Sequence, residues 1–203
     1  MRRSRAVVAA GALILLGTTA AVANAAQNEP APRHQSAEAA PEAAKKGSAA
    51  AAWCKQQGGA AQTQYPYRVD PRTQKLVQLG GEREMCTFTA KDGSRIALAA
   101  DTLNSDKVTL AQRAYLDKIA DPGGHPGNPS IGYCQSLNGT AMYGPGKLDA
   151  GGWGPQGATK TDEVIAACMF GDGSVIDAWG LKYHTGGVIR GADLAKKFRA
   201  SGA

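Results

Sequence analysis

The stretch CMFGDGS at residues 168–174 is typical of a β-strand that runs into a tight turn. Its Asp-Gly pair follows an apolar segment, and such a pair favours a β-hairpin because the turn needs residues that tolerate positive φ. Cys168 and Phe170 are two positions apart, so a strand places both side chains on one face. The chain carries a similar pattern upstream, CTFTAKDGS at residues 86–94. The sequence therefore predicts two similar hairpins, whose returning strands are RIALA (95–99) and VIDAWGL (175–181).

A cysteine-bearing segment with helix-capping residues precedes each hairpin. The two segments are SAAAAWCKQQGG at 48–59 and NPSIGYCQSLNG at 128–139. Ser48 and Asn128 are strong N-cap residues, because their side-chain oxygens accept hydrogen bonds from free backbone N–H groups. Pro129 suits the first helical position, and the closing Gly-Gly and Asn-Gly pairs suit the left-handed conformation that ends a helix. Each segment is therefore predicted to form a helix of about ten residues.

The N-terminus has the pattern of a secretory signal peptide. Three arginines precede an apolar run of about a dozen residues, and Ala23-Asn24-Ala25 matches an A-x-A cleavage site. A retained membrane anchor is the less favoured alternative, since the run is shorter than the ~20 residues of a span. Cleavage lowers the number of Lys and Arg from 23 to 20 against 17 acidic residues, so the net charge falls from +6 to +3. That charge gives no support for a nucleic-acid partner.

The four cysteines all follow this segment, and an even count in a secreted chain indicates disulfides. Four cysteines allow three pairings. The repeated pattern favours Cys54–Cys86 and Cys134–Cys168, because each bridge then joins a helix to a strand within its own repeat. Loops of this size contribute roughly 3–4 kcal/mol in the chain-entropy model. Bridges between the two repeats remain the alternative.

The sequence as a whole predicts an α+β fold made of two tandem small disulfide-stapled modules. Each module has one helix packed on a short antiparallel sheet, and a connecting helix, expected over 106–120 with Asp106 as its cap, joins the two. A last short helix is expected over 191–200. The expected boundaries are a signal peptide (1–25), a flexible linker (26–47), module 1 (48–104), the connecting helix and a Gly/Pro loop (105–127), module 2 (128–190) and a C-terminal helix or tail (191–203).

The motif Asn-Pro-Ser-x-x-Tyr-Cys at 128–134, followed by Asn-Gly, Cys-x-Phe-x-Asp-Gly-Ser and a late Trp, resembles a small bacterial domain of unknown function. That domain occurs in exported proteins and often carries a hemolysin label. Residues 128–181 resemble it well, whereas residues 48–103 resemble a degenerate copy without the Asn-Pro pair and the Trp. The resemblance implies a disulfide-linked α+β module, and it brings no catalytic residue with it.

The sequence contains few residue patterns that are typical of a catalytic or metal site. The cysteines are assigned to bridges, and no G-x-S-x-G motif is present. Ser174, Asp177 and His184 would complete a triad on paper, but Ser174 lies in the predicted hairpin turn. Asp172 and Asp177 lack the regular acidic spacing of a calcium loop. We therefore expect no catalytic residue, metal or cofactor.

Aromatic residues in two loop-like inserts are the candidate binding residues. Tyr143 and Trp153 lie in the glycine-rich segment 140–157, and Tyr65 and Tyr67 lie in the matching region of the first repeat. Rigid aromatic side chains on loops make good binding anchors. The alternative is that these rings fold back to cover a thin core.

These observations favour a secreted, non-enzymatic binding protein. Its partner would be an extracellular protein, for example a protease, or a component of the cell envelope. The first alternative is a secreted hydrolase with a site between the modules, built from Asp92, Asp172 and His184. The second is a membrane-active protein, as the hemolysin label implies, although no stable membrane insertion is expected because the mature chain has no long apolar segment.

Overall fold

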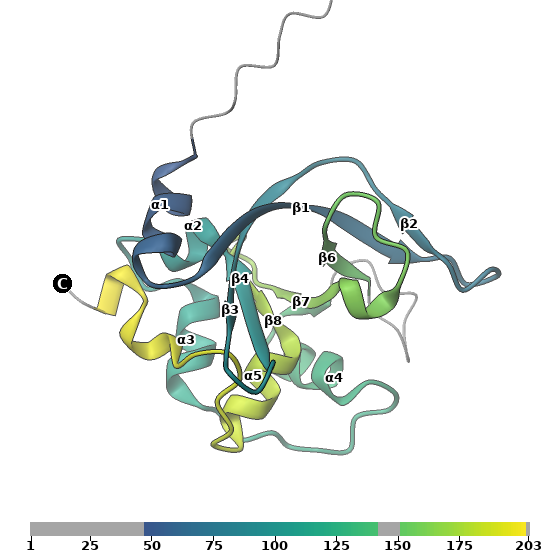
Figure 1. Cartoon of the computed structure of the whole chain (residues 1–203). Coiled ribbons are helices and arrows are strands. Elements are labelled where there is room, and N and C mark those ends of the chain that lie inside the picture. The colour runs from purple at the N-terminus through teal and green to yellow at the C-terminus, as the bar shows by residue number, and fades with distance from the viewer. Residues whose placement is uncertain (1–46, 142–150, 202–203) are drawn as a thin grey trace, which may run out of the picture. The chain divides into compact units, whose positions relative to one another are not determined.

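The computed structural model describes residues 47–141 and 151–201, which belong to one compact unit spanning Ala44–Ala203. Figure 1 shows that this unit combines a curved sheet with short helices in an α+β fold. The signal peptide expected over 1–25 and nearly all of the linker expected over 26–47 lie outside the described residues. None of the helices in the described part of the chain has the length and apolarity that a membrane span requires.

The strands of both halves of the chain form one antiparallel sheet. They are β1 (Ala60–Val69), β2 (Leu76–Gln78), β3 (Arg83–Thr89), β4 (Arg95–Ala99), β5 (Thr140–Ala141), β6 (Gly152–Gly154), β7 (Ile165–Met169) and β8 (Val175–Asp177). The order is β2-β1-β3-β4-β8-β7-β5, and β6 pairs with both β1 and β7. The path from β1 through β3, β4, β8, β7 and β6 thus returns to β1 and closes a small barrel.

Strand β1 is long enough to pair with three other strands along its length. Its first half pairs with β3, with Ala61 opposite Cys86. Its second half pairs with β6, with Pro66 opposite Trp153, and also with β2. Figure 1 shows β1 curving across the unit from α1 to β6. This one strand therefore links the two halves of the chain.

The helices lie outside the barrel. They are α1 (Ala49–Gln56), α2 (Ala100–Leu103), α3 (Leu110–Asp117), α4 (Pro129–Ser136) and α5 (Ala178–Thr185), with 3₁₀ turns at Thr161–Glu163, Leu194–Lys196 and Arg199–Ser201. Helices α1 and α4 begin where their caps predict. The Ser48 hydroxyl accepts a hydrogen bond from the Ala51 N–H, and the Asn128 side chain accepts one from the Ser130 N–H. Gly58 (φ 81°) and Asn138 (φ 60°) follow the two helices in the left-handed conformation.

Both disulfides are present, in the pairing favoured by the repeat. Cys54 bonds to Cys86 and Cys134 bonds to Cys168, and each pair has its Cα atoms 5.7 Å apart. Each bridge ties a helix outside the barrel to a barrel strand. The two halves also share a strand register, since Cys86 lies opposite Leu98 and Cys168 lies opposite Ile176.

Two predicted helices differ from those observed. The connecting helix begins at Leu110 rather than after Asp106, because Thr109 and Gln112 form a reciprocal capping box that satisfies the free N–H groups there. The helix expected over 191–200 is replaced by 3₁₀ turns. Asp193 caps the first turn, at Leu194–Lys196, by accepting a hydrogen bond from the Ala195 N–H.

The returning strand predicted over 175–181 is strand only as far as Asp177. The Asp177 carboxylate accepts a hydrogen bond from the Trp179 N–H at 2.9 Å, which makes Asp177 the N-cap of α5. The β-like composition of this segment favours a strand, but the cap starts a helix in mid-segment. His184, expected after the strand, therefore lies inside α5.

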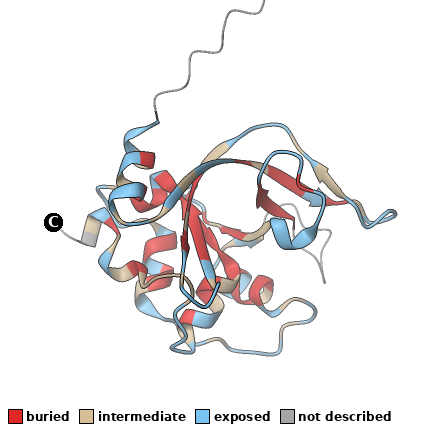
Figure 2. Ribbon diagram, viewed as in Figure 1, coloured by how far each residue is buried: buried red, intermediate tan, exposed pale blue. Residues whose placement is uncertain are grey.

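Side chains alternate between two apolar cores along the barrel strands. The larger core lies between the barrel and the helices and is built from residues such as Phe88, Ile96, Leu98, Tyr115, Tyr133 and Leu181. Figure 2 shows the buried residues concentrated on the strands and on the helix faces that meet them. The inward-facing side chains form a smaller core at one end of the barrel: Met85, Ala99, Trp153, Ala167 and Val175. The other end of the barrel interior carries polar and charged side chains among apolar ones.

Candidate functional site

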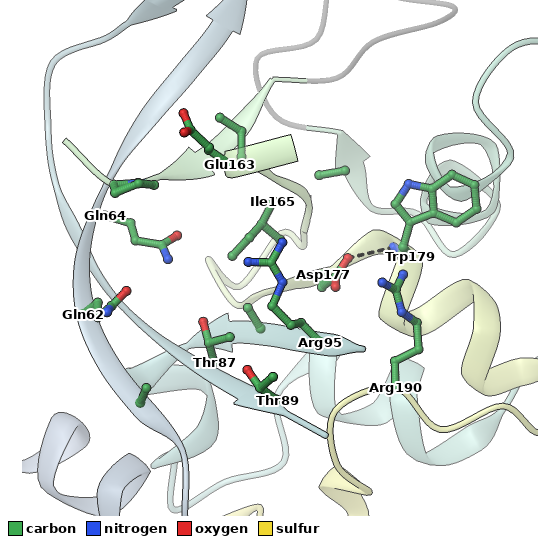
Figure 3. A pocket seen from close by; sticks show the side chains of 15 residues that line it. Gln62, Gln64, Thr87, Thr89, Arg95, Glu163, Ile165, Asp177, Trp179 and Arg190 are labelled. Atoms are coloured by element: carbon green, nitrogen blue, oxygen red, sulfur yellow. Dashed lines mark hydrogen bonds between the residues drawn. The ribbon is translucent and has the colours of Figure 1, made fainter. Parts of the chain in front are cut away.

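The polar end of the barrel holds a pocket of about 420 Å³. Along a barrel strand, one inward-facing residue lies in the small core and the next lies in the pocket. Met85 is followed in this way by Thr87 on β3, and Val175 by Asp177 on β8. Both halves of the chain supply the walls. Figure 3 shows the side chains of β1, β3, β4 and β8 converging on the same space. The closed barrel thus encloses an apolar floor and a polar mouth.

Uncharged polar side chains line the wall formed by β1 and β3. Gln62, Gln64, Thr87 and Thr89 all border the pocket. Gln64 is 5% exposed, and its Oε1 accepts no hydrogen bond from any described residue. Figure 3 places this amide at the edge of the cavity. A buried carbonyl oxygen without a donor costs free energy, so Gln64 is ready to accept a hydrogen bond from a ligand.

Asp177 is the buried acidic group of the pocket, with 7% of the residue exposed. Burial raises the pKa of its carboxyl group to about 6, because the charged form loses hydration. The backbone N–H groups of Gly180 and Trp179 and the positive charges of Arg190 and Arg95 act in the opposite direction on this pKa. Asp177 therefore titrates close to physiological pH.

Two arginines reach the pocket on either side of Asp177, as Figure 3 shows. Arg95 extends from β4 and donates a hydrogen bond to the Asp162 carbonyl at 3.3 Å. Arg190 comes from the segment after α5, and its guanidinium lies 5.2 Å from the centre of the Tyr183 ring. Within residues 47–141 and 151–201, neither guanidinium forms a salt bridge. The pocket therefore holds cationic hydrogen-bond donors with free capacity.

Glu163 and Trp179 complete the rim of the pocket. The backbone N–H groups of Lys160 and Thr159 donate to the Glu163 carboxylate and lower its pKa. The Trp179 side chain is half-buried and stacks on Tyr183 with the ring centres 5.6 Å apart. An ionised carboxylate and an aromatic ring thus border the same opening.

The aromatic residues that were predicted to bind a partner, as far as the structure describes them, do not line the pocket. Trp153 is 6% exposed and belongs to the small core inside the barrel. Tyr67 is 1% exposed, and its hydroxyl lies 2.7 Å from the Pro155 carbonyl oxygen and accepts a hydrogen bond from the Ala158 N–H. Tyr65 is half-buried beside Glu82, and Tyr143 lies outside the described residues. The rings of Trp153 and Tyr67 are buried and cannot contact a partner. The pocket, rather than these aromatic residues, is therefore the candidate site.

The groups considered for a hydrolase do not meet in the pocket. Asp92 and Asp172 lie in two different hairpin turns. Asp92 accepts a hydrogen bond from the Ser94 N–H, and Asp172 accepts one from the Leu110 N–H. His184 is 3% exposed and stacks on Tyr115 with ring centres 3.7 Å apart. None of the three lines the pocket. In the described part of the chain, no three His, Cys, Asp or Glu residues are grouped as metal ligands.

Comparisons with protein-family models, with curated proteins and with solved structures found no match. The resemblance to the hemolysin-labelled domain therefore rests on its sequence motifs. The candidate site rests on the geometry of the barrel.

Proposed function

We propose that the protein is a secreted binding protein whose barrel pocket holds a polar ligand the size of a sugar unit, presented by the cell envelope. The observation that carries this proposal is the buried Gln64 Oε1, which borders the pocket and accepts no hydrogen bond from the described residues. A volume of about 420 Å³ falls within the range of small-ligand sites. The disulfides suit the oxidising compartment that the predicted signal peptide implies.

The chemistry of the walls favours a saccharide. Amide and hydroxyl side chains, such as those of Gln62 and Thr87, offer both donors and acceptors, as sugar hydroxyl groups do. Trp179 adds a half-buried aromatic face on which the C–H groups of a sugar ring can stack. A long apolar ligand would leave these polar groups unpaired, at a cost in affinity.

We also infer that the two halves are diverged copies of one unit. Support comes from the matching helix caps, disulfides and strand registers, with Ala61 opposite Cys86 and Ala141 opposite Cys168. Both copies contribute to the proposed site. Gln64 and Arg95 come from the first half, and Asp177 and Trp179 come from the second.

Isothermal titration of the mature protein with a panel of soluble neutral and acidic envelope saccharides tests the binding function. We expect at least one saccharide to bind, and Gln64→Leu to weaken it about tenfold through loss of one hydrogen bond. Trp179→Ala should weaken it as well, whereas Gln56→Leu, on an exposed position of α1 outside the pocket, serves as the control. Failure of the whole panel to bind, or binding that neither pocket variant changes, would contradict the proposal.

One observation favours a hydrolase as the second candidate. Asp177, with a pKa of about 6, and Glu163, with a lowered pKa, line the same pocket. Two carboxyl groups held at different pKa values are the arrangement used for a general acid and a general base. Release of reducing ends from a bound oligosaccharide, abolished by Asp177→Asn and by Glu163→Gln, would establish this activity. Binding without such release supports the binding protein.

A further inference from the structure

We propose that the ligand of the barrel pocket carries a carboxylate that binds between Arg95 and Arg190, and that its binding makes Asp177 take up a proton. This inference rests on the proposed binding function and names the chemical class of its ligand. It follows from three charged side chains that line one pocket, where Asp177 is buried, Arg190 is half-buried and Arg95 is exposed.

The first step is the unused donor capacity of the two guanidinium groups. Each guanidinium offers five N–H donors in a fixed plane. Arg95 uses one of them on the Asp162 carbonyl, and Arg190 lies against the Tyr183 ring. A carboxylate accepts paired hydrogen bonds from a guanidinium, and such charge-assisted bonds are stronger than neutral ones. The pocket thus contains the donors that an anion needs.

The second step is that Asp177 does not occupy those donors. One of its oxygens caps α5 through the Trp179 N–H. Neither arginine is within salt-bridge distance of its carboxylate, although both positive charges act on it through space. An incoming carboxylate therefore finds the guanidinium groups open, with the Asp177 carboxyl group as its buried neighbour.

The third step concerns the charges that face Asp177. Arg95 approaches from β4, Arg190 approaches from the segment after α5, and Glu163 borders the same pocket from the 3₁₀ turn before β7. Helix α5 contributes backbone N–H groups. A ligand carboxylate brings a negative charge close to Asp177 and neutralises the positive charges of the two arginines. Both changes favour the protonated form of Asp177.

The sign of the pH dependence follows from this coupling. In the free protein, burial already raises the pKa of Asp177 to about 6. A bound carboxylate raises this pKa further, so the complex holds more protons than the free protein near neutral pH. Affinity for a carboxylate ligand should therefore fall as the pH rises above about 6, whereas affinity for a neutral ligand should not.

Glucuronate and glucose provide a matched pair of probes, because they differ only in a carboxylate or a hydroxymethyl group on the ring. Titration calorimetry of the mature protein at about pH 5 and about pH 8 measures both affinities, with the glucuronate carboxyl group ionised throughout. We expect glucuronate to bind at least tenfold more tightly than glucose at the lower pH and to lose at least tenfold at the higher pH. Near pH 7, titrations in buffers of different ionisation enthalpy should show proton uptake.

Three variants assign the effect to residues. Arg95→Gln and Arg190→Gln should each bring the glucuronate affinity toward that of glucose. Asp177→Asn keeps an oxygen for the α5 cap and should abolish the pH dependence and the proton uptake. Arg68→Gln, on an exposed position of β1 outside the pocket, is the control and should change nothing.

The outcomes separate this inference from the function on which it rests. Equal affinity for glucuronate and glucose, or no glucuronate binding at the lower pH, overturns the carboxylate site, while a neutral saccharide that binds still supports the proposed function. Acetate that binds as tightly as glucuronate supports the carboxylate site and contradicts a saccharide ligand. A pH dependence that survives Asp177→Asn overturns the proton coupling.

Discussion

Asp177 has two roles that make different demands on its charge. As the cap of α5 it accepts a hydrogen bond from a helix N-terminus, which favours the ionised carboxylate. As a buried group at the pocket it loses hydration, which favours the neutral acid. The second effect is the larger one, so the folded protein binds this proton more tightly than the unfolded chain does.

Stability should therefore depend on pH through Asp177. Its pKa is 3.8 in the absence of the fold and about 6 within it, so its favourable contribution is full below about pH 4 and is lost as the pH rises through about 6. We expect Asp177→Asn to match the wild type at about pH 4 and to be more stable at about pH 8, by an amount on the order of 2–3 kcal/mol. Urea unfolding at the two pH values measures this. A variant less stable than the wild type at about pH 8 would show that Arg95 and Arg190 stabilise the ionised form.

Gly139 is restricted by the neighbouring disulfide. A Cβ atom there would lie 2.5 Å from Cys168 Sγ and 2.9 Å from the Cys134 carbonyl oxygen, both closer than packed atoms allow. We expect Gly139→Ala to destabilise the fold by about 1–3 kcal/mol, the usual cost of overpacking. Gly80→Ala is the control, because no atom of the described residues lies within 4 Å of its added methyl group. Equal denaturation midpoints for the two variants would contradict the tight packing.

At the scale of elements, local chemistry made part of the fold predictable. Ser48 and Asn128 start α1 and α4 because an N-cap acts on residues two or three positions away. The cysteine pairing was predictable for a similar reason, since each bridge joins cysteines only 32 or 34 residues apart. Each of these elements depends on neighbours that are close in the sequence.

Other elements depend on contacts that no local pattern reveals. Residues 178–181 were predicted as strand, but they form the first turn of α5, which the Asp177 side chain caps. Strand β6 is Gly-Trp-Gly, which has little β-propensity of its own and exists because β1 and β7 pair with it. Pocket residues such as Gln62 and Gln64 occupy every second position of a strand, so their side chains share one face of the sheet. That face becomes the barrel interior only when the sheet closes. The candidate site was therefore missed by sequence reasoning.

Each disulfide should act on the helix-to-strand unit that it closes. The sequence separations of 32 and 34 residues give about 3–4 kcal/mol for each bridge in the chain-entropy model. We expect Cys54→Ala with Cys86→Ala, and Cys134→Ala with Cys168→Ala, to lose similar amounts of unfolding free energy in guanidinium titrations. A loss confined to one pair would show that the other half of the barrel holds its helix without a covalent bond.

At the scale of the whole unit, the barrel closes only when both halves are present. Strand β1 of the first half pairs with β6 of the second, and Leu98 of β4 pairs with Ile176 of β8. The small core combines Met85 and Ala99 with residues of β6, β7 and β8. The two halves therefore share both their hydrogen bonds and their interior.

Separate halves should accordingly fail to fold. We expect fragments 47–127 and 128–201, each with its disulfide formed, to show no cooperative thermal unfolding, whereas a chain that contains both should unfold in a single transition. Circular dichroism and two-dimensional NMR of each fragment measure this. Dispersed spectra from either fragment alone would indicate that the halves are independent modules after all.

The positions of the tryptophans give the protein a built-in optical reporter. Trp153 lies in the apolar small core, Trp179 borders the pocket, and Trp53 lies outside the barrel with its indole N–H donating to the Lys197 carbonyl. An occupant of the pocket would exclude solvent from the Trp179 indole and leave Trp53 in its present surroundings. In a Trp53→Phe variant the remaining rings are Trp179 and Trp153, and only Trp179 lines the pocket, so a shift of the emission to shorter wavelength on occupancy would report on Trp179. Binding could then be followed in real time without any attached dye.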